Sequence, residues 1–371
     1  MVLSFVILCL FYAFTFFEGI KENKDYLLKG FVAGFFYITL QLLRVYGQTF
    51  FPDIPEYYNI FNSIKSIDFV WINGYGLEHY EDIDEFGGVF AVPIEKGFLL
   101  LISIFKLFSG SFELFLLLIS TFQLYIFYLF CKKLRIKVVA GLMAYTGLIF
   151  ITFHLGMIRQ SIAFCFFLIG LMNIDRKLLF TLTILLGTAF HKSLLICLFL
   201  LFSDVFIKRK LVYLLSVFSL ILYIFQIDLI TELINSVLYL DGFQLGKVDF
   251  YLNVDRSNNY LGIGFWERLT LLIVTNMAYS DLSKRNLVTS NMNLLFNVGL
   301  FIIILQLVYF ASPTITSRFR YYFALFPVLF ILEYTYLLKD LILKRMIIFI
   351  IFIYLQFQLY FLGTYLQVGN S

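Results

Sequence analysis

Long apolar runs separated by short polar junctions make up most of this chain. Runs that are long enough to cross a bilayer, or nearly so, occupy residues 1–17, 27–43, 112–131, 138–155, 157–173, 178–190, 193–207, 211–227, 265–280, 292–311, 321–338 and 344–363. Because lipid offers backbone amides no hydrogen-bond partner, each run is expected to be a helix. The pattern predicts an all-α polytopic membrane protein with about 12 transmembrane helices.

A further apolar stretch, "EKGFLLLISIFKLFSG" at 95–110, is short and is interrupted by Lys106. If it were a span, the basic junction "KKLRIK" would lie on the outer face, against the tendency of Lys and Arg to remain cytoplasmic. We therefore expect an interfacial or re-entrant helix on the outer side.

Basic clusters fall at every second junction between the apolar runs. They comprise Lys21 and Lys24; Lys132, Lys133, Arg135 and Lys137; Arg176 and Lys177; Lys208, Arg209 and Lys210; Lys284 and Arg285; and Lys339, Lys344 and Arg345. Since such clusters mark the cytoplasmic side, both termini and the long loops 45–111 and 228–264 are expected outside. Neither an internal repeat nor a flexible linker is evident in the sequence, so residues 1–371 are expected to form a single membrane domain.

Composition agrees with this class. The 371 residues are 61% hydrophobic, 20% aromatic and only 14% charged, with a mean hydropathy of +0.90. A soluble domain carries roughly a quarter charged residues, so an ordinary soluble protein is excluded. The cysteines lie in or beside apolar runs without a C-x-x-C pair and are interpreted as core residues. The first run lacks a basic leader and a small-residue cleavage site, and is expected to be a retained helix.

The junction in "LLGTAFHKSLLICLFLLF" (185–202) places His191 and Lys192 between two short runs on the expected outer side. A helix of 178–190 would cover only about 20 Å of a hydrocarbon core about 30 Å thick. Ionisable groups at that depth are costly unless they face a wet cavity. Alternatively, Lys192 snorkels to the headgroups and His191 is an ordinary interfacial residue.

Other cations occur at outer helix ends, where the charge rule predicts few. "FHLGMIRQSIAF" carries Arg159 and Gln160, and "SPTITSRFRYYF" carries two arginines followed by two tyrosines. A single residue of this kind would be a snorkelling anchor, but the set of five fits anchoring poorly: Arg44, Arg159, Lys192, Arg318 and Arg320. Because guanidinium binds phosphate in a planar, bidentate fashion, the set indicates a site for an anionic headgroup or lipid-linked phosphate.

The first outer loop adds carboxylates and tyrosines. In "FPDIPEYYNIFNSI" (51–64), apolar residues recur at helical spacing, which predicts an amphipathic helix resting on the membrane. Its Asp53 and Glu56 are either solvated or aimed at substrate, and its Tyr57 is either an interface anchor or a sugar contact. The segment "GLEHYEDIDEF" (76–86) is interpreted as a solvated acidic loop; the alternative is a divalent cation bound by His79 and the five carboxylates, although their spacing matches no metal motif.

At these residues the chain resembles a known family. The segments that carry the resemblance are "PDIPEYYNIF", "EKGFLLLISIFKLF", "SFELFLLLIS", "IRQSIAFCFFLIG", "FHKSLL" and "RFRYYF". In this order, from about residue 50 to 325, they resemble the EpsG family of Wzy-type polysaccharide polymerases. The family usually has Glu-Pro-Gly-Tyr where this chain has Glu95-Lys96-Gly97-Phe98.

The resemblance implies polymerisation of oligosaccharide repeat units carried on undecaprenyl pyrophosphate, at the outer face of a bacterial cytoplasmic membrane. It also implies an architecture like that of class C glycosyltransferases, and no nucleotide sugar. The expected partners are the lipid-linked oligosaccharides and membrane lipid, with a chain-length regulator and a flippase as further candidates. No cofactor, metal or nucleic acid is expected.

The candidate residues divide into three roles. Catalytic candidates are His191 as the base, Arg159, Asp53, Glu56 and Glu95. Pyrophosphate-binding candidates are Arg159, Arg318, Arg320, Arg44 and Lys192. Substrate-positioning candidates are Gln160, Tyr57, Tyr321 and Tyr322.

Two other functions remain open from the sequence. A lipid-linked oligosaccharide flippase or transporter would also suit many helices and outer arginines, although such proteins more often show related halves. A ligase-like or acyl-transferring enzyme would share the lipid donor or a membrane histidine, but not this set of motifs.

Overall fold

The computed structural model describes residues 53–64, 81–83, 89–91, 94–202, 209–225, 263–308, 320 and 322–368. Several expectations lie outside these residues, namely the runs 1–17 and 27–43 and the candidates Arg44, Arg318 and Tyr321. Asp53 is the first residue of a helix, but its side chain is outside the described part.

Helices make up most of the described chain. In order, the elements are α3 (Asp53–Ser63), β1 (Glu81–Ile83), β2 (Val89–Ala91), α4 (Lys96–Phe105), α5 (Phe112–Leu134), α6 (Val138–Tyr145), η2 (Thr146–Gly156), α7 (Ile158–Leu171), α8 (Lys177–Thr188), η3 (Lys192–Phe202), α10 (Arg209–Ile224), α13 (Ile263–Lys284), α14 (Ser290–Val308), α16 (Leu325–Leu337) and α17 (Leu341–Val368). Each apolar run expected from residue 112 onward therefore coincides with a helical segment. The short stretch at 95–110 forms α4 and is a separate helix.

Two of the apolar runs depart from regular α-helix. The run 138–155 begins as α6 and continues as the π-helix η2, and the run 193–207 contains the 3₁₀ helix η3. A 3₁₀ helix rises about 2.0 Å per residue against about 1.5 Å in an α-helix. The 11 residues of η3 therefore reach about 22 Å instead of about 16 Å, which offsets part of the shortness of this run.

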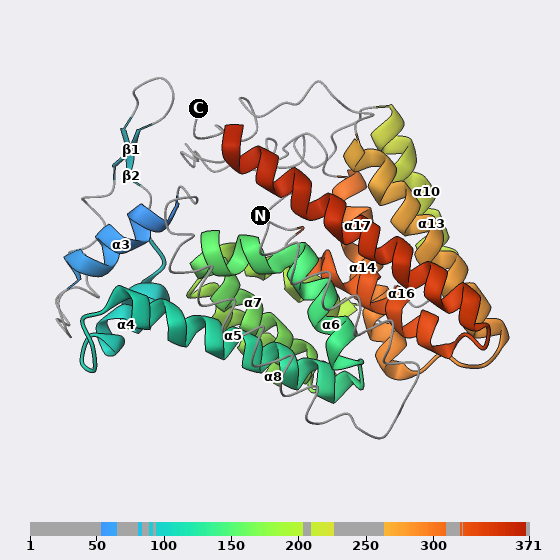
Figure 1. The fold of residues 1–371 in the computed structure, drawn as a ribbon, viewed down its shortest axis with the longest axis horizontal. Coiled ribbons are helices and arrows are strands. Elements are labelled where there is room, and N and C mark those ends of the chain that lie inside the picture. The colour runs from blue at the N-terminus through green and yellow to red at the C-terminus, as the bar shows by residue number, and fades with distance from the viewer. Residues whose placement is uncertain are drawn as a thin grey trace.

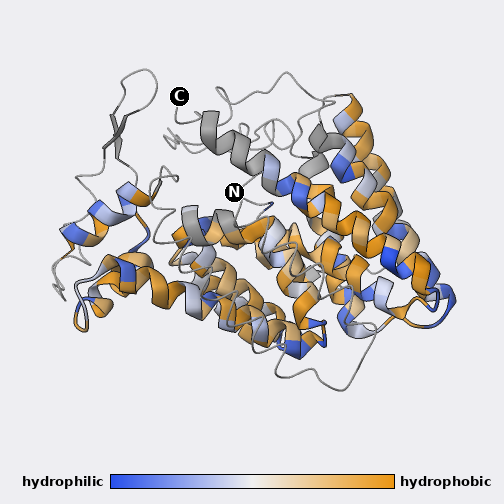
Figure 2. Ribbon diagram, viewed as in Figure 1, coloured by the Kyte–Doolittle hydropathy of each residue, from blue (hydrophilic) through white to orange (hydrophobic). Residues whose placement is uncertain are grey.

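Apolar surface on the outside of the bundle is typical of a membrane protein. Among the described residues, Phe112–Leu134 and Leu341–Gln358 are long and apolar enough to span, and the remaining apolar helices are shorter. Hydrophobic residues run along the helices, and polar ones gather near their ends and in α3 (Figure 2). Large exposed apolar side chains line α17, among them Ile342, Met346, Phe349, Ile353 and Phe357. Lipid is the natural neighbour of such a face, while the count of twelve spans stays a prediction.

The helices pack in two groups (Figure 1). The first comprises α5 to α8 with η2 and η3, and the second comprises α10, α13, α14, α16 and α17. One core cluster runs through both groups, from Ile126 to Leu355. A smaller cluster joins α3, α4, the start of α5 and the start of α7.

The amphipathic helix expected in the first loop is confirmed as α3, but its apolar face does not rest on lipid. Tyr57, Ile60, Phe61 and Ile64 are buried in the smaller core cluster. The Phe61 ring lies 5.4 Å from those of Phe112 and Phe115, centroid to centroid. Protein therefore covers the surface that we had expected to face the membrane, because α4 and α5 present an aromatic face of their own.

Lys106 fixes the far end of α3. Its ammonium donates to the backbone carbonyls of Asn62 and Ile64, where α3 runs out of intrahelical donors, and lies 4.7 Å from the centroid of the Phe61 ring. A cation at a helix C-terminus also complements the helix dipole. Burial lowers the pKa of this ammonium from its ordinary value. The residue that interrupts the apolar stretch at 95–110 thus links α4 to α3.

Beyond α3, part of the acidic loop forms a small ribbon. β1 and β2 pair antiparallel, with Glu81 opposite Ala91 and Ile83 opposite Val89. Three residues of the segment 76–86, which we expected to be a solvated loop, thus form one strand of a hairpin.

Candidate functional site

The start of α4 is held against the end of α8 by a direct backbone contact. The Gly97 amide donates to the Ala189 carbonyl at 2.9 Å. A Cβ at Gly97 would lie 2.5 Å from that oxygen, so no other residue fits without displacing one backbone. This contact places Glu95, two residues before Gly97, beside the junction that carries His191, two residues after Ala189.

The Glu95 side chain forms an ion pair and does not cap its own helix. It is the residue before the first turn of α4, and its carboxylate makes no hydrogen bond to that turn. Instead, Oε2 accepts from Nη1 of Arg159 at 2.6 Å. The Glu95 side chain is 11% exposed and that of Arg159 is 17% exposed, so the pair is largely removed from water.

Arg159 occupies the first turn of α7, where the helix dipole disfavours a cation. Glu95 offsets that cost, and Tyr57 of α3 adds a second contact. The Tyr57 hydroxyl oxygen accepts from Nε of Arg159 at 3.4 Å, and the guanidinium carbon lies 5.7 Å from the centroid of the Tyr57 ring. α3, α4 and α7 thus meet at the Arg159 guanidinium, which is held by Glu95 and by Tyr57.

His191 belongs to a second set of contacts at the same junction. Its backbone amide donates to the Gly187 carbonyl, which closes the end of α8. Its Nδ1 lies 2.6 Å from the Ser193 hydroxyl oxygen, and Ser193 donates to the Tyr322 hydroxyl at 3.0 Å. The imidazole, Ser193 and Tyr322 thus form one chain of hydrogen bonds. In the tautomer whose Nδ1 donates to Ser193, Nε2 carries the lone pair.

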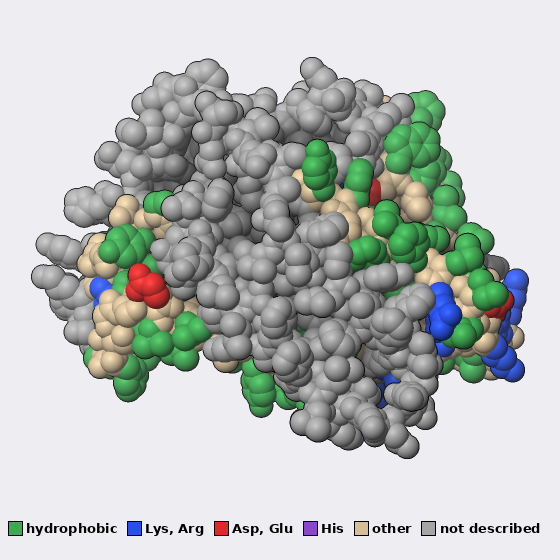
Figure 3. Space-filling view, viewed as in Figure 1, with side chains coloured by type: hydrophobic (Ala, Val, Ile, Leu, Met, Phe, Trp, Pro, Cys, Tyr) green, Lys and Arg blue, Asp and Glu red, His purple; other side chains and the backbone are tan. Residues whose placement is uncertain are grey.

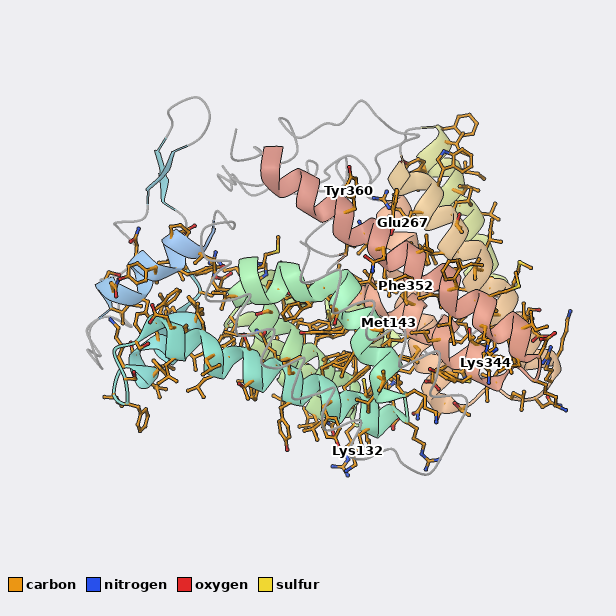
Figure 4. The ribbon with its side chains drawn as sticks, viewed as in Figure 1. Lys132, Met143, Glu267, Lys344, Phe352 and Tyr360 are labelled. Carbon is orange, nitrogen blue, oxygen red and sulfur yellow. The ribbon has the colours of Figure 1, made fainter. Side chains whose placement is uncertain are left out.

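A third polar cluster lies between α13, α17 and the residues before α16. Nη2 of Arg320 donates to Oε1 of Glu267 and to Oε1 of Gln358, each at 2.8 Å. The Tyr354 hydroxyl donates to the same Glu267 oxygen at 2.6 Å. Figure 4 shows Glu267 between α13 and α17. Arg268, half-buried, lies close enough to Arg320 and Glu267 for their charges to act on it.

The chain from 320 to 322 connects this third cluster to the His191 junction. Arg320 faces Glu267 and Gln358, whereas Tyr322, fully buried, reaches Ser193. Within "RFRYYF", Arg320 therefore belongs to the third cluster and Tyr322 to the His191 junction.

With this geometry in place, the chain was compared with known proteins. The family model described as the EpsG family matches residues 35–370. The chain belongs to the EpsG family. Membership implies a membrane protein of the Wzy-type polysaccharide polymerases. Neither the curated proteins nor the solved structures gave a match to the chain.

The turn at 95–98 keeps two of the four residues that are usual in the EpsG family. Glu95 and Gly97, which agree with the family's usual Glu-Pro-Gly-Tyr, make the contacts to Arg159 and Ala189. Lys96 is exposed and Phe98 is buried, with its ring 5.6 Å from that of Tyr57. The two departures from the pattern therefore leave the ion pair and the close backbone approach intact.

The structure brings some of the candidate residues together and separates others. Arg159, Glu95 and Tyr57 meet directly, and His191 and Tyr322 share Ser193 at the adjoining junction. Arg320 is instead paired with Glu267. Gln160 is buried in α7, Glu56 is half-buried on α3, and Lys192 is exposed at the start of η3.

Sequence reasoning missed most of the third cluster in this EpsG-family chain. Glu267 and Arg268 are adjacent charges within the apolar run 265–280, and this position was the available signal. Tyr354 and Gln358 gave no signal, because Tyr and Gln are unremarkable in a long span. Only the hydrogen bonds of Tyr354 to Glu267 and of Arg320 to Gln358 show their role.

Proposed function

We propose that this chain joins undecaprenyl-pyrophosphate-linked oligosaccharide repeat units into a surface polysaccharide at the outer face of the cytoplasmic membrane. The observation that carries the proposal is the Gly97–Ala189 contact, because it sets the Glu95–Arg159 pair beside the His191 junction. A guanidinium held by a carboxylate, with an imidazole at the adjoining junction, supplies the groups that glycosyl transfer from a pyrophosphate requires.

The reaction forms one covalent bond and breaks another. A hydroxyl oxygen of the acceptor sugar bonds to the anomeric carbon of the growing chain, while the bond from that carbon to the pyrophosphate oxygen breaks. The electron pair leaves with the pyrophosphate, whose negative charge increases. Nε2 of His191 takes the hydroxyl proton, and the Ser193 contact at Nδ1 keeps the ring in the tautomer that can do so.

Arg159 acts on the leaving group in this scheme. Fixed cations in a water-poor site stabilise developing negative charge without reorganising, and Arg159 is already oriented by Glu95 and Tyr57. Glu95 thereby positions Arg159. Arg318 and Arg44 remain candidates for the same pyrophosphate, and Lys192, Asp53, Glu56, Gln160 and Tyr321 for acceptor or headgroup contacts.

The placement of basic residues supports a site on the outer face. In Figure 4, Lys132 and Lys344 lie toward one edge of the bundle, and Glu267 and Tyr360 toward the other. Figure 3 shows Lys and Arg side chains gathered at the edge where α17 begins. If that edge is cytoplasmic, as the basic clusters predict, the opposite ends of α13 and α17 face outward.

The decisive test is His191→Ala in the living strain, read as a gel ladder of the surface glycan. We expect single repeat units and no longer chains, at unchanged amounts of protein in the membrane fraction. Thr188→Ala is the matched control, because its hydroxyl donates to the Leu185 carbonyl of its own helix, α8, and it should give the wild-type ladder.

Two results would contradict the proposal. A full-length ladder in His191→Ala would remove the imidazole from the catalytic set. Loss of all outward-facing lipid-linked repeats on deletion of the chain would indicate a flippase, since a polymerase deletion accumulates single repeats on the lipid.

A further inference from the structure

A single backbone turn lies between the third cluster and the His191 junction. The Ala324 amide donates to the Arg320 carbonyl at 2.8 Å, which closes this 320–324 turn just before α16. Pro327 has no amide hydrogen, so it cannot donate to the Phe323 carbonyl four residues before it. The turn is therefore coupled less tightly to α16 than a continuous helix would be, and its side-chain contacts have more influence on where it lies.

The side chains of this turn reach in different directions. Successive residues of a helix are about 100° apart around its axis, so Arg320 and Tyr322 are about 200° apart. Arg320 donates to Glu267 of α13 and to Gln358 of α17. The Tyr322 hydroxyl accepts instead from Ser193 in the first turn of η3. A shift of the 320–324 turn that loosens one of these contacts therefore alters the other.

The contacts of Arg320 are the stronger anchor for the turn. Its Nη2 donates to two acceptors, each at 2.8 Å, and one of them is a carboxylate. That carboxylate, Glu267, is itself held by the Tyr354 hydroxyl at 2.6 Å. Charge-assisted hydrogen bonds are roughly twice as strong as neutral ones, and the contact between Ser193 and Tyr322, at 3.0 Å, is neutral. The third cluster therefore has more influence on the turn than Ser193 has.

Aromatic packing offers the Tyr322 ring another support. Its centroid lies 6.2 Å from that of Phe167 and 6.5 Å from that of Phe153. These separations are near the wide end for aromatic pairs, whose dispersion contacts change little when one ring slides. A hydrogen bond needs its oxygen placed to within a few tenths of an ångström. Ring packing alone therefore does not fix the hydroxyl against Ser193.

We propose that Glu267 is a positioning residue for the His191 imidazole, although it belongs to another cluster. Glu267 fixes Arg320, and the 320–324 turn transmits that position to Tyr322. The Tyr322 hydroxyl then sets where Ser193 meets Nδ1 of His191. This inference rests on the proposed function only in taking His191 as the group that reacts.

The first test needs no polymer synthesis. It is the NMR chemical shift of Nδ1 of His191, measured on the purified full-length chain in lipid nanodiscs with isotopically labelled histidine. The loss of one signal in His191→Ala identifies it. Tyr322→Phe removes the contact to Ser193 and should move this shift. Glu267→Ala should move it in the same direction, because the turn no longer holds the Tyr322 hydroxyl in place.

Asp281→Ala is the matched control. Asp281 is also an ion-paired carboxylate of α13, with Arg285 as its partner, and it also accepts from a tyrosine, Tyr334 of α16. That tyrosine lies beyond Pro327, towards the other end of α16, so the 320–324 turn is not involved. The control should leave the Nδ1 shift at its wild-type value. An equal movement of the shift in Asp281→Ala would overturn the proposal.

A second variant keeps the test decisive if Glu267→Ala does not fold. Gln358→Leu removes one acceptor of Nη2 and leaves the ion pair of Arg320 intact, so it should move the shift in the same direction by a smaller amount. A wild-type shift in whichever of these two variants folds would overturn the proposal. A wild-type shift in Tyr322→Phe would do so as well, because the imidazole would then not respond to that contact.

The rate of ladder growth in pulse-labelled cells gives the functional side of the same coupling. Glu267→Ala should slow chain lengthening a few-fold, and the double variant with Tyr322→Phe should be no slower than Tyr322→Phe alone, because both changes act through one contact. Multiplication of the two effects would show that Glu267 acts by another route and would overturn the proposal. A full ladder in His191→Ala would end the proposed reaction without changing the NMR result.

Discussion

The clusters around Arg159 and Arg320 use the same residue types in opposite ways. Arg159 is enclosed by Glu95 and Tyr57, in a pair that is charge-balanced and backed by the aromatic core of α3, α4 and α5. Arg320 contacts both Glu267 and Gln358, shares the Glu267 oxygen with Tyr354, and is more exposed, at 30% against 17% for Arg159. The first arrangement encloses a guanidinium beside the aromatic core, whereas the second joins α13, α17 and the residues before α16 through a shared carboxylate.

The same substitution in both clusters should show this difference most strongly. Glu95→Gln leaves Arg159 buried without a countercharge, and we expect a loss of about 3 kcal/mol in the free energy of unfolding. Glu267→Gln should cost only about 1 kcal/mol, because Arg320 keeps Gln358 and is more exposed. Thermal melts of the two purified variants measure the difference, and equal losses would show that both pairs are structural.

A smaller effect is expected from the backbone contact that assembles the first cluster. Gly97→Ala forces a methyl group onto the Ala189 carbonyl, and should cost about 1–3 kcal/mol and shorten the glycan ladder. Gly110→Ala is the control, since its Cβ would meet nothing within 4 Å.

The smallest effect should come from the contacts behind His191. Ser193→Ala removes the partner of Nδ1 and should slow chain lengthening about tenfold. Tyr322→Phe should slow it only a few-fold, because Ser193 can still accept from the imidazole. Rates of ladder growth in pulse-labelled cells measure both. A larger effect of Tyr322→Phe than of Ser193→Ala would reverse the order of contacts derived above.

Sequence patterns were most successful where one local rule decides the outcome. The apolar face of α3 was predicted from helical spacing, and the separate helix at 95–110 from the charge of neighbouring junctions. What covers α3 was predicted wrongly, because an apolar face has the same spacing whether lipid or protein lies against it. The π- and 3₁₀-helical segments η2 and η3 were also missed, since hydrophobicity does not distinguish these windings from α-helix.

The same distinction between local patterns and long-range contacts applies to the candidate site. "IRQ" and "FHKS" stood out because cations and a histidine are costly in an apolar chain. The partners of these residues could not be predicted, because Glu95 and Arg159 are 64 residues apart and Ser193 and Tyr322 are 129 residues apart.

The sequence by itself determined that this is a helical membrane protein of the EpsG family, and it predicted which polar residues carry its chemistry. These follow from composition, hydrophobic runs and local motifs, each of which depends on residues close in the chain. Only the tertiary structure decided which carboxylate pairs with which cation, Glu95 with Arg159 and Glu267 with Arg320. Those pairings depend on close approaches such as the Gly97–Ala189 contact and the Tyr354–Glu267 hydrogen bond. Coulomb energy depends on distance in space, and separation along the chain does not set that distance.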